Sequence, residues 1–433
     1  MSHVFGRGGA ALPRIARAEG VQMWDSDGRR YLDACGGAIV VGVGHGVTSI
    51  VDAAAAQAKQ VAYAHGTMFT ADILEQYADE LATVLPMDDP RVYPVSGGSE
   101  AVETALKMAR AYHLARGEDR HVIVGRRGSY HGNTRGALDV GGRASLRAPY
   151  LPWLGQAAHV GTPYEYRCAY PDSHPHGCAA RHADELDALF SSQPVAAFIA
   201  EPIAGAALGA CVPPDEYWPA VAEVCRRHGV LLIADEVMTG FGRTGAWFGS
   251  DHWGLRPDIL VAGKGAGSGY WPLGLAVASG DVHDAITSFT HGFTYSHHIV
   301  GAATGSAVLR ELRDRDLIAA SATRGQQLID TLTDGLAGHA YVGDVRGRGL
   351  LVAVEFVADR GTKTPFARAE GVAARVVDAA REAGVLVYSS TGGADGVDGD
   401  LILLGPPLCI TAAEVDEVSA SVIKAISAVL PST

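Results

Sequence analysis

A lysine followed by glycines stands in VAGKGAGSGYWPLG, residues 261–274, and could do chemistry in either of two ways. Such a lysine can help a glycine-rich loop to bind phosphate, or its amine can attack an aldehyde to form an imine. The nucleotide-binding P-loop needs a glycine where Asp258 stands, and a dinucleotide-binding loop needs one where Ser268 stands. Lys264 itself is therefore the candidate reagent. The alternative is an ordinary lysine that extends from a surface loop.

Three further motifs hold groups that would suit a phosphorylated, aldehyde-bearing ring such as pyridoxal phosphate (PLP). Ser96–Ser99, sequence SGGS, directly precedes a predicted helix and could bind a phosphate, unless Ser99 is only an N-cap. Tyr130 could stack on a ring, although a lone tyrosine is more often a packing residue. Asp235 follows an apolar run and could hold a protonated ring nitrogen, unless it is a solvated acid at a strand end. Each signal is weak alone, but the four in this order are specific.

Buried strands must position these groups. Continuous apolar runs bounded by breakers predict strands at 121–125, 195–201, 230–236, 259–264 and 275–280. Because these runs do not alternate with polar residues, they favour a mostly parallel sheet that is covered on both faces. Helical spacing predicts helices at 99–116 and 215–229, the second of which ends at Gly229.

The pattern changes at about residue 300. A helix-rich stretch at 300–338 is followed by short apolar runs and by an amphipathic helix near the C-terminus, which predicts a smaller α+β domain. We therefore expect an N-terminal segment over 1–60 that packs with the small domain. A large PLP-binding domain would follow over 61–300, with the C-terminal small domain over 301–433.

Composition limits the class of protein and its partners. The 433 residues are 48% hydrophobic and 19% charged, as in a globular protein with a sizeable core. A net charge of −13 opposes nucleic-acid binding. The longest apolar run contains Glu201 and Pro202, which argues against a membrane span. Six cysteines without a C-x-x-C pair, and no signal peptide, predict a cytoplasmic protein.

One cluster of soft ligands is interpreted as a surface loop. Cys168, His174, His176 and Cys178 lie close together in a proline-containing segment. Their spacing matches no standard zinc pattern, so we expect no metal site.

Eight motifs together resemble those of the class III (ω-type) aminotransferases, which are fold-type I PLP enzymes. They run from about Trp24 to the C-terminus and are SGGSEAVETALKMAR, SYHGNT, AEPIAG, DEVMTGFGRTG, PDILVAGKGAGSGYWPLG, GFTYSHH, VRGRGL and GPPLCIT. The resemblance implies an α/β fold with a large, mostly parallel sheet and a smaller α+β domain. It also implies PLP as the cofactor, and transfer of an amino group from an amine or amino-acid donor to a keto acid or aldehyde.

The resemblance also implies roles around the cofactor ring. Lys264 would be the Schiff-base lysine and proton carrier, and Asp235 would contact the ring nitrogen. Val237 would pack on one ring face and Tyr130 on the other. His131, in the same motif as Tyr130, would be a further cofactor-binding residue.

Other positions would bind the phosphate or support the ring. Gly98 and Ser99 would hold the phosphate of their own subunit. Thr294 would reach the phosphate of a neighbouring subunit, which implies a homodimer with shared active sites. Glu201 is similar to the acid of the family's E-P motif, and Arg243 to the structural arginine of its G-R-T-G motif.

The chain departs from the family's pattern where substrates would bind. Met238 replaces a common glutamine, and His297 and Ile299 replace glycine and proline. No arginine stands between Ser390 and Pro406, where members that bind an α-carboxylate carry one. A substrate without that carboxylate and an arginine arriving from elsewhere are both open.

Several apolar and glycine positions are expected near the ligand. The segments 35–46 and 64–69, with Met68 and Phe69, would border the substrate. The glycines after Lys264 would leave room for the ring.

Two alternative functions are open at this point. One is an amino-acid racemase or epimerase on the same scaffold, which would need no keto acceptor. The other is a non-catalytic PLP-binding regulator, which the acidic charge and the lack of a DNA-binding segment oppose.

Overall fold

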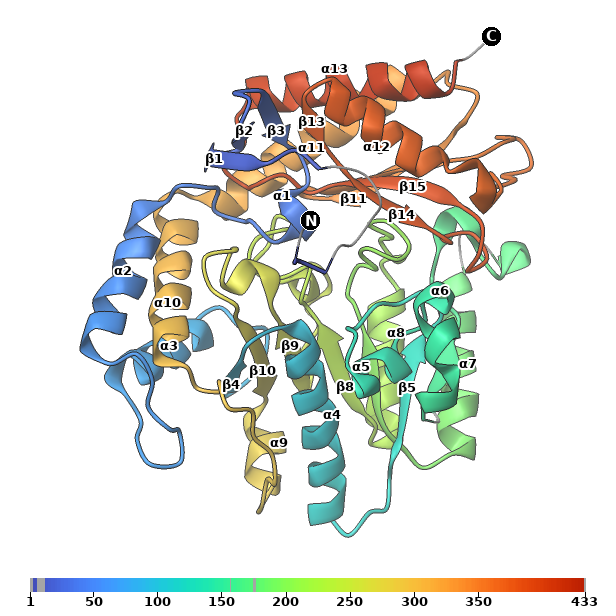
Figure 1. Ribbon diagram of the computed structural model, residues 1–433. Coiled ribbons are helices and arrows are strands. Elements are labelled where there is room, and N and C mark those ends of the chain that lie inside the picture. Colours follow the sequence, from blue (N-terminus) through green and yellow to red (C-terminus); the bar gives the residue numbers. More distant parts are fainter. Residues whose placement is uncertain (1–2, 6–11, 156, 174–176, 432–433) are drawn as a thin grey trace.

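A seven-stranded sheet forms the centre of the computed structural model, which describes residues 3–5, 12–155, 157–173 and 177–431 (Figure 1). The strands are β4 (Arg91–Val95), β5 (Val122–Arg126), β6 (Ala158–Val160), β7 (Val195–Ala200), β8 (Leu231–Asp235), β9 (Ile259–Ala262) and β10 (Gly274–Ala278). Their order is β4-β10-β9-β8-β7-β5-β6. The five strands from β6 to β9 are parallel, and β10 is antiparallel to both of its neighbours. The predicted, mostly parallel sheet is confirmed.

The central strands are buried on both faces, as their continuous apolar runs predicted. Every residue of β7, β8, β9 and β10 is buried. Two strands were not predicted, β4 and β6, and both lie at the edges of the sheet. Edge strands are partly exposed, so they do not need the unbroken apolar run that marks a central strand.

Helices cover the two faces of this sheet. On one face α4 (Gly98–Ala115) packs in a core that includes Ile199 and Ile233, and Figure 1 shows it crossing in front of the strands. On the other face α7 (Cys178–Ser192) and α8 (Tyr217–His228) pack with Phe198 and Leu232. Helix α8 ends at Gly229 in the left-handed region, at φ 61°, which confirms the predicted helix end.

A smaller antiparallel sheet is built from the C-terminal part of the chain. Its order is β11-β12-β15-β14. The strands are β11 (Val342–Arg348), β12 (Leu351–Phe356), β14 (Tyr388–Thr391) and β15 (Asp400–Leu404), and its helices are α11 (Leu317–Leu336), α12 (Val372–Glu382) and α13 (Ala412–Val429). In Figure 1 this sheet and its helices lie above the large sheet.

The N-terminal segment contacts both parts. Its strands belong to a third sheet, in which β3 (Arg30–Asp33) pairs in parallel with β13 (Val385–Leu386). The remaining elements are β1 (Ile15–Glu19), β2 (Gln22–Asp25), β3 (Arg30–Asp33), α1 (Gly36–Ile39), α2 (Thr48–Gln60), α3 (Asp72–Ala82), α5 (Arg135–Val140), α6 (Ala144–Arg147), α9 (Gly280–Ala285) and α10 (Ile299–Asp314). Helix α2 packs beside α10, where Ser49 Oγ donates to Glu311 Oε1 at 2.6 Å (Figure 1). The domain boundaries at residues 60 and 300 stay a prediction.

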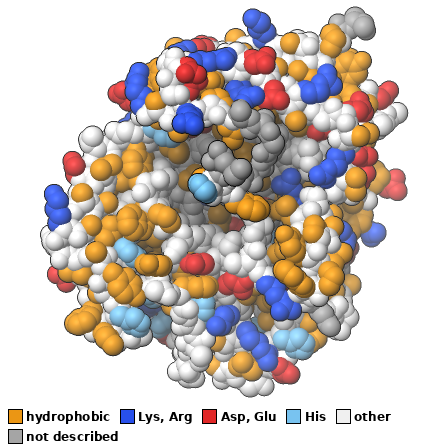
Figure 2. Space-filling model, in the orientation of Figure 1, with side chains coloured by type: hydrophobic (Ala, Val, Ile, Leu, Met, Phe, Trp, Pro, Cys, Tyr) orange, Lys and Arg blue, Asp and Glu red, His pale blue; other side chains and the backbone are white. Residues whose placement is uncertain are grey.

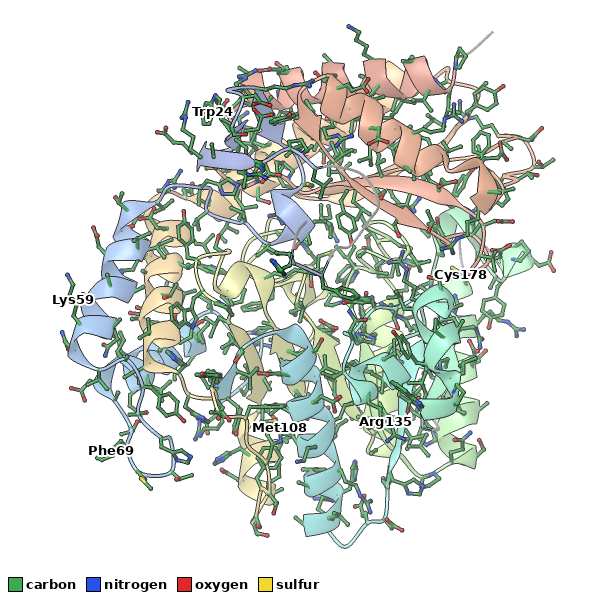
Figure 3. All side chains as sticks on the ribbon, viewed as in Figure 1. Trp24, Lys59, Phe69, Met108, Arg135 and Cys178 are labelled. Carbon is green, nitrogen blue, oxygen red and sulfur yellow. The ribbon has the colours of Figure 1, made fainter. Side chains whose placement is uncertain are left out.

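The sequence predicted neither a membrane span nor a metal site. Among the described residues, none of the helices combines the length and apolarity that a bilayer-crossing span needs. Cys168 and Cys178 are free cysteines, and Figure 3 labels Cys178 at the right of the molecule. His174 and His176 lie outside the described residues. No group of three or more potential metal ligands occurs within the part of the chain that the structure describes.

Arg243 forms hydrogen bonds with three segments that are far apart in the sequence. Its guanidinium is buried and donates to the carbonyl oxygens of Leu350 at 2.9 Å, Pro406 at 2.6 Å and Val41 at 3.4 Å. These acceptors belong to the small-sheet segment, the C-terminal segment and the N-terminal segment. The structure therefore gives this arginine a tertiary role.

We expect Arg243→Ala to lower the free energy of unfolding of the apoprotein by about 3 kcal/mol, because it leaves buried carbonyl oxygens without a donor. Urea unfolding followed by tryptophan fluorescence measures this. Arg375→Ala is the matched control, since the exposed Arg375 side chain donates to a single carbonyl oxygen of the described residues, that of Val429. An equal loss in both variants would contradict the assigned role.

Candidate active site

One cavity collects most of the predicted site residues. It has a volume of about 180 Å³, and the face drawn in Figure 2 is hollowed near its centre. The residues that line it are Gly98, Ser99, Tyr130, His131, Gly132, Glu201, Gly205, Ala206, Asp235, Val237, Met238 and Lys264. Eight of the nine predicted cofactor-binding positions are in this set, and Thr294 is not.

Lys264 enters the cavity from the end of a buried strand. Strand β9 ends at Ala262, and a short 3-10 turn, η5 (Lys264–Ala266), follows. The lysine has φ +40°, a conformation that is unfavourable for a residue with a side chain and that recurs at functional sites. Burial lowers the pKa of Lys264 from 10.5 to about 8, although Asp235 and Glu201 act in the opposite direction.

Asp235 and His131 form a buried pair on the cavity wall. His131 Nδ1 donates to Asp235 Oδ2 at 2.6 Å, and the backbone N–H of Val237 donates to Asp235 Oδ1 at 3.0 Å. Both residues of the pair are buried, at 3% exposure each. The carboxylate is thus fixed in orientation at the carboxyl end of β8, as the position of Asp235 predicted. The pairing with His131 was not predicted, because the two residues are 104 positions apart.

Glu201 also lines the cavity and contacts the backbone of Tyr130 and a buried arginine. Its Oε1 accepts from the backbone N–H of Tyr130 at 3.4 Å, and its Oε2 lies 3.6 Å from Arg126 Nη2. Burial raises the pKa of the Glu201 carboxyl. Arg126 also donates to the carbonyl oxygen of Glu201 at 2.5 Å, so one buried cation supports this wall. The sequence analysis predicted no role for Arg126. The only sign that this residue is buried was the apolar run that became β5.

The predicted phosphate loop begins a long helix. Helix α4 starts at Gly98 with Gly97 as its N-cap residue, so the alternative that Ser99 is the N-cap is wrong. Ser99 Oγ instead accepts from the backbone N–H of Asn133 at 3.1 Å. A side chain at Gly98 would approach Val237 to 3.0 Å, which explains the glycine by close packing. The free N–H groups of the first helical turn favour an anion at this end of the cavity.

The glycines after Lys264 do not leave room for a ring. Gly265 packs against Phe241, where an added Cβ would lie 2.9 Å from the Phe241 Cβ, and Gly267 packs against the carbonyl of Trp271. Neither glycine lines the cavity. The predicted clearance is therefore wrong, because these glycines allow the backbone of the lysine loop to pack against its neighbours.

Three predicted residues lie outside the cavity of their own chain. Met68 and Phe69 are 75% and 67% exposed, and Figure 3 shows Phe69 on a loop at the lower left, away from the centre. Thr294 is also exposed, and its carbonyl oxygen accepts from Tyr63 Oη at 2.8 Å. Within one chain these residues do not border the substrate. The reach of Thr294 to a neighbouring subunit stays a prediction.

The chain matches known proteins along nearly its whole length. Residues 6–426 match the family described as aminotransferase class-III. The chain belongs to that family. The resemblance that the motifs indicated is confirmed.

Similar proteins agree with this assignment. The aminotransferase YodT of Bacillus subtilis, described as uncharacterized, is 38% identical over 94% of this chain and 93% of its own. Putrescine–pyruvate aminotransferase of Pseudomonas aeruginosa is 34% identical over 93% of this chain and 88% of its own. An amine transaminase from an uncultivated Pseudomonas species, whose crystal structure shows a PLP-bound form, is 37% identical in sequence to this chain. It covers 99% of both chains with a TM-score of 0.92.

This class-III aminotransferase has the fold-type I architecture and uses PLP as its cofactor. The residues of the cavity fit that cofactor. His131 Nε2 and Glu201 Oε2 are buried on the wall and have no hydrogen-bond partner within the described residues. Three groups of the cavity match three groups of PLP. The Lys264 amine suits the aldehyde, the buried Asp235 carboxylate suits the ring nitrogen, and the N-terminus of α4 suits the phosphate. Since the three relatives are named aminotransferases or a transaminase, they support transamination and not the racemase alternative.

Proposed function

We propose that this aminotransferase binds PLP covalently through Lys264 and transfers the amino group of an amine donor to a small 2-oxo acid. The observation that carries the proposal is that Lys264, Asp235 and the start of α4 line one cavity. When bound, PLP supplies an aldehyde for the lysine amine and a ring that takes up electrons as the donor loses a proton.

Asp235 would keep a proton on the ring nitrogen, because a buried carboxylate favours the charged, protonated form of that nitrogen. His131 would hold the carboxylate in place through its 2.6 Å hydrogen bond. Val237 and Tyr130 would bind the two faces of the ring, and Gly98 and Ser99 the phosphate. Once displaced by the donor, the Lys264 amine would carry the proton between the donor carbon and the cofactor.

The donor proposal is supported by relatives that act on simple amines. One relative is named for putrescine and pyruvate, and a similar solved structure is described as an amine transaminase. The test is a panel of amines and amino acids, each with pyruvate or 2-oxoglutarate as acceptor. Amine consumption that requires the acceptor, with a matching yield of amino acid, would support the proposal. Inversion of an amino acid without any acceptor would overturn it.

The pKa of Lys264 gives a pH prediction for cofactor capture. Only the neutral amine attacks an aldehyde, and with a pKa of about 8 roughly a tenth of it is neutral at pH 7. The rate at which the apoprotein captures added PLP should therefore rise about tenfold between pH 7 and 9 and then level off. Stopped-flow absorbance measures this rate. A rate that still rises in proportion to hydroxide above pH 9 would show that the lysine has an ordinary pKa.

We also propose a cytoplasmic homodimer in which Thr294 lies near the partner's cavity. Thr294 lies on an exposed surface with large apolar side chains, namely Tyr63, Met68, Phe69 and Tyr295. Monomeric proteins rarely leave such a patch in water, so a second copy would cover it. Light scattering that gives the mass of one chain would contradict the dimer, and cell fractionation tests the location.

A further inference from the structure

Arg143 is a half-buried cation without a carboxylate partner among the residues that the structure describes. Within that part of the chain its side-chain hydrogen bonds run from Nη2 to Ser390 Oγ at 3.2 Å and to the carbonyl oxygen of Thr391 at 3.4 Å. Its Nε is buried and has no acceptor within the described residues. Burial lowers the pKa of Arg143. A guanidinium has five N–H donors, so most of its capacity is unused.

Several other arginines with buried donor groups are paired with a carboxylate. Arg126 lies 3.6 Å from Glu201, and Arg167 lies 2.7 Å from Glu355. Full use of the donors does not distinguish them from Arg143, because Arg126 Nε and Arg167 Nη2 are also buried without a hydrogen-bond partner within the described residues. Arg346 forms ion pairs with Asp344 at 2.9 Å and Glu355 at 2.8 Å. Arg243 has no carboxylate partner within the described residues but donates to three carbonyl oxygens. Because a half-buried charge with unused N–H donors and no counter-ion is costly, these features of Arg143 point to an anion supplied by a ligand.

The backbone before Arg143 is fixed beside the segment that carries Tyr130, although Arg143 itself does not line the cavity. Arg143 lies between α5 and α6, and the preceding residue, Gly142, is bonded to the segment that carries Tyr130. Gly142 N donates to the carbonyl oxygen of Ser129 at 3.1 Å, and the carbonyl oxygen of Gly142 accepts from Gly128 N at 3.0 Å. Tyr130 lines the cavity; burial raises the pKa of its phenol, and the nearby Arg143 guanidinium acts in the opposite direction. Basic side chains are visible at the edge of the hollow in Figure 2.

The segment that Arg143 contacts through Ser390 and Thr391 has no cationic residue of its own. From residue 382 to residue 423 the chain contains no lysine or arginine, although it includes β14 and β15. The loop after β14 also approaches the cavity wall, since a Cβ at Gly393 would lie 3.7 Å from the carbonyl oxygen of Ala207, next to Ala206. Arg143 thus brings a positive charge to a place where this segment offers none.

We propose that Arg143 binds the carboxylate of the substrate, so that at least one substrate of this aminotransferase is a 2-oxo acid or the matching amino acid. The planar guanidinium can bind the two carboxylate oxygens with parallel hydrogen bonds. This inference rests on the proposed function. It answers the question left by the missing arginine before Pro406, because the cation comes from the other side of the cavity.

Arg143→Gln tests this proposal through the choice of acceptor. The aminated holoenzyme is reacted with pyruvate, and separately with propanal, which has no carboxylate. We expect the KM for pyruvate to rise about 10- to 100-fold, because charged hydrogen bonds of this kind are lost, while the reaction with propanal changes less than about twofold. Arg143→Lys should restore part of the pyruvate reaction. Arg368→Gln is the matched control, since Arg368 is exposed and its side chain forms no hydrogen bond within the described residues.

Equal losses with both acceptors, or an unchanged KM for pyruvate, would overturn the role of Arg143. A wild-type enzyme that aminates neither acceptor would instead overturn the proposed function. A second measurement does not depend on the folding of a variant. Propanoate should inhibit the wild-type reaction competitively against pyruvate, and propanamide should not. Equal inhibition by both compounds would contradict a carboxylate site.

Discussion

Lys264→Ala is expected to lower kcat/KM by about 10⁴-fold or more, because it removes both the attachment of the cofactor and the carrier of the proton. The two roles belong to one amine at the end of β9, so no neighbouring residue can take over either of them. Asp235, which shares the cavity, is held by its own hydrogen bonds to His131 and Val237. Amino transfer from an amine to pyruvate measures the loss.

The fold should survive this substitution. The lysine side chain faces the cavity, and its removal relieves the cost of burying its charge, so the apoprotein should unfold at an equal or higher urea concentration. Lys107→Ala is the matched control, since Lys107 is an exposed lysine on α4, and it should keep full activity. Borohydride reduction of the holoenzyme followed by peptide mapping should place the cofactor on Lys264. Label on another lysine would contradict the assignment.

The second large effect is expected for Asp235→Asn, with kcat reduced about 10³-fold while the cofactor still binds. An amide cannot hold the positive charge of a protonated ring nitrogen, so the ring would lose its capacity to accept electrons. The amide oxygen could still accept from His131 Nδ1, but without its charge this hydrogen bond would be weaker than the one that the carboxylate forms. The absorbance spectrum of the holoenzyme and the single-turnover rate with an amine donor measure the two consequences separately.

Asp258→Asn is the control for this variant. Asp258 is a half-buried aspartate directly before a strand of the same sheet, and its Oδ2 accepts from the backbone N–H of Leu232 at 2.7 Å. It lies at the start of β9, at the opposite end of the strand from Lys264. We expect this variant to lose stability and to keep kcat. A similar fall in kcat for both variants would mean that Asp235 acts only through the fold.

Sequence alone predicted the residues that stand at the ends of buried strands. Asp235 and Lys264 each follow an unbroken apolar run, and such runs become adjacent parallel strands with their carboxyl ends at one edge. Strands β8 and β9 are indeed neighbours, with Asp235 paired opposite Val261. The glycine loop before α4 was found in the same way, from a local signal that needs only a few residues.

The edge strands and the glycines were predicted less well. Strands β4 and β6 are partly exposed, so their residues carry no continuous apolar pattern. Gly265 and Gly267 were interpreted as space for a ligand, but they are small because the backbone and side chains of other segments lie against them. A sequence does not show what a glycine faces.

The sequence by itself determined the kind of chemistry, because the amine, the acid and the phosphate loop are each set by a local pattern. Only the tertiary structure decided which of these groups are paired. His131 meets Asp235 across 104 residues, and Arg143 meets Ser390 across 247. Contacts over such separations depend on strand order and on how loops converge at the edge of the sheet. No periodic signal in the chain records that arrangement.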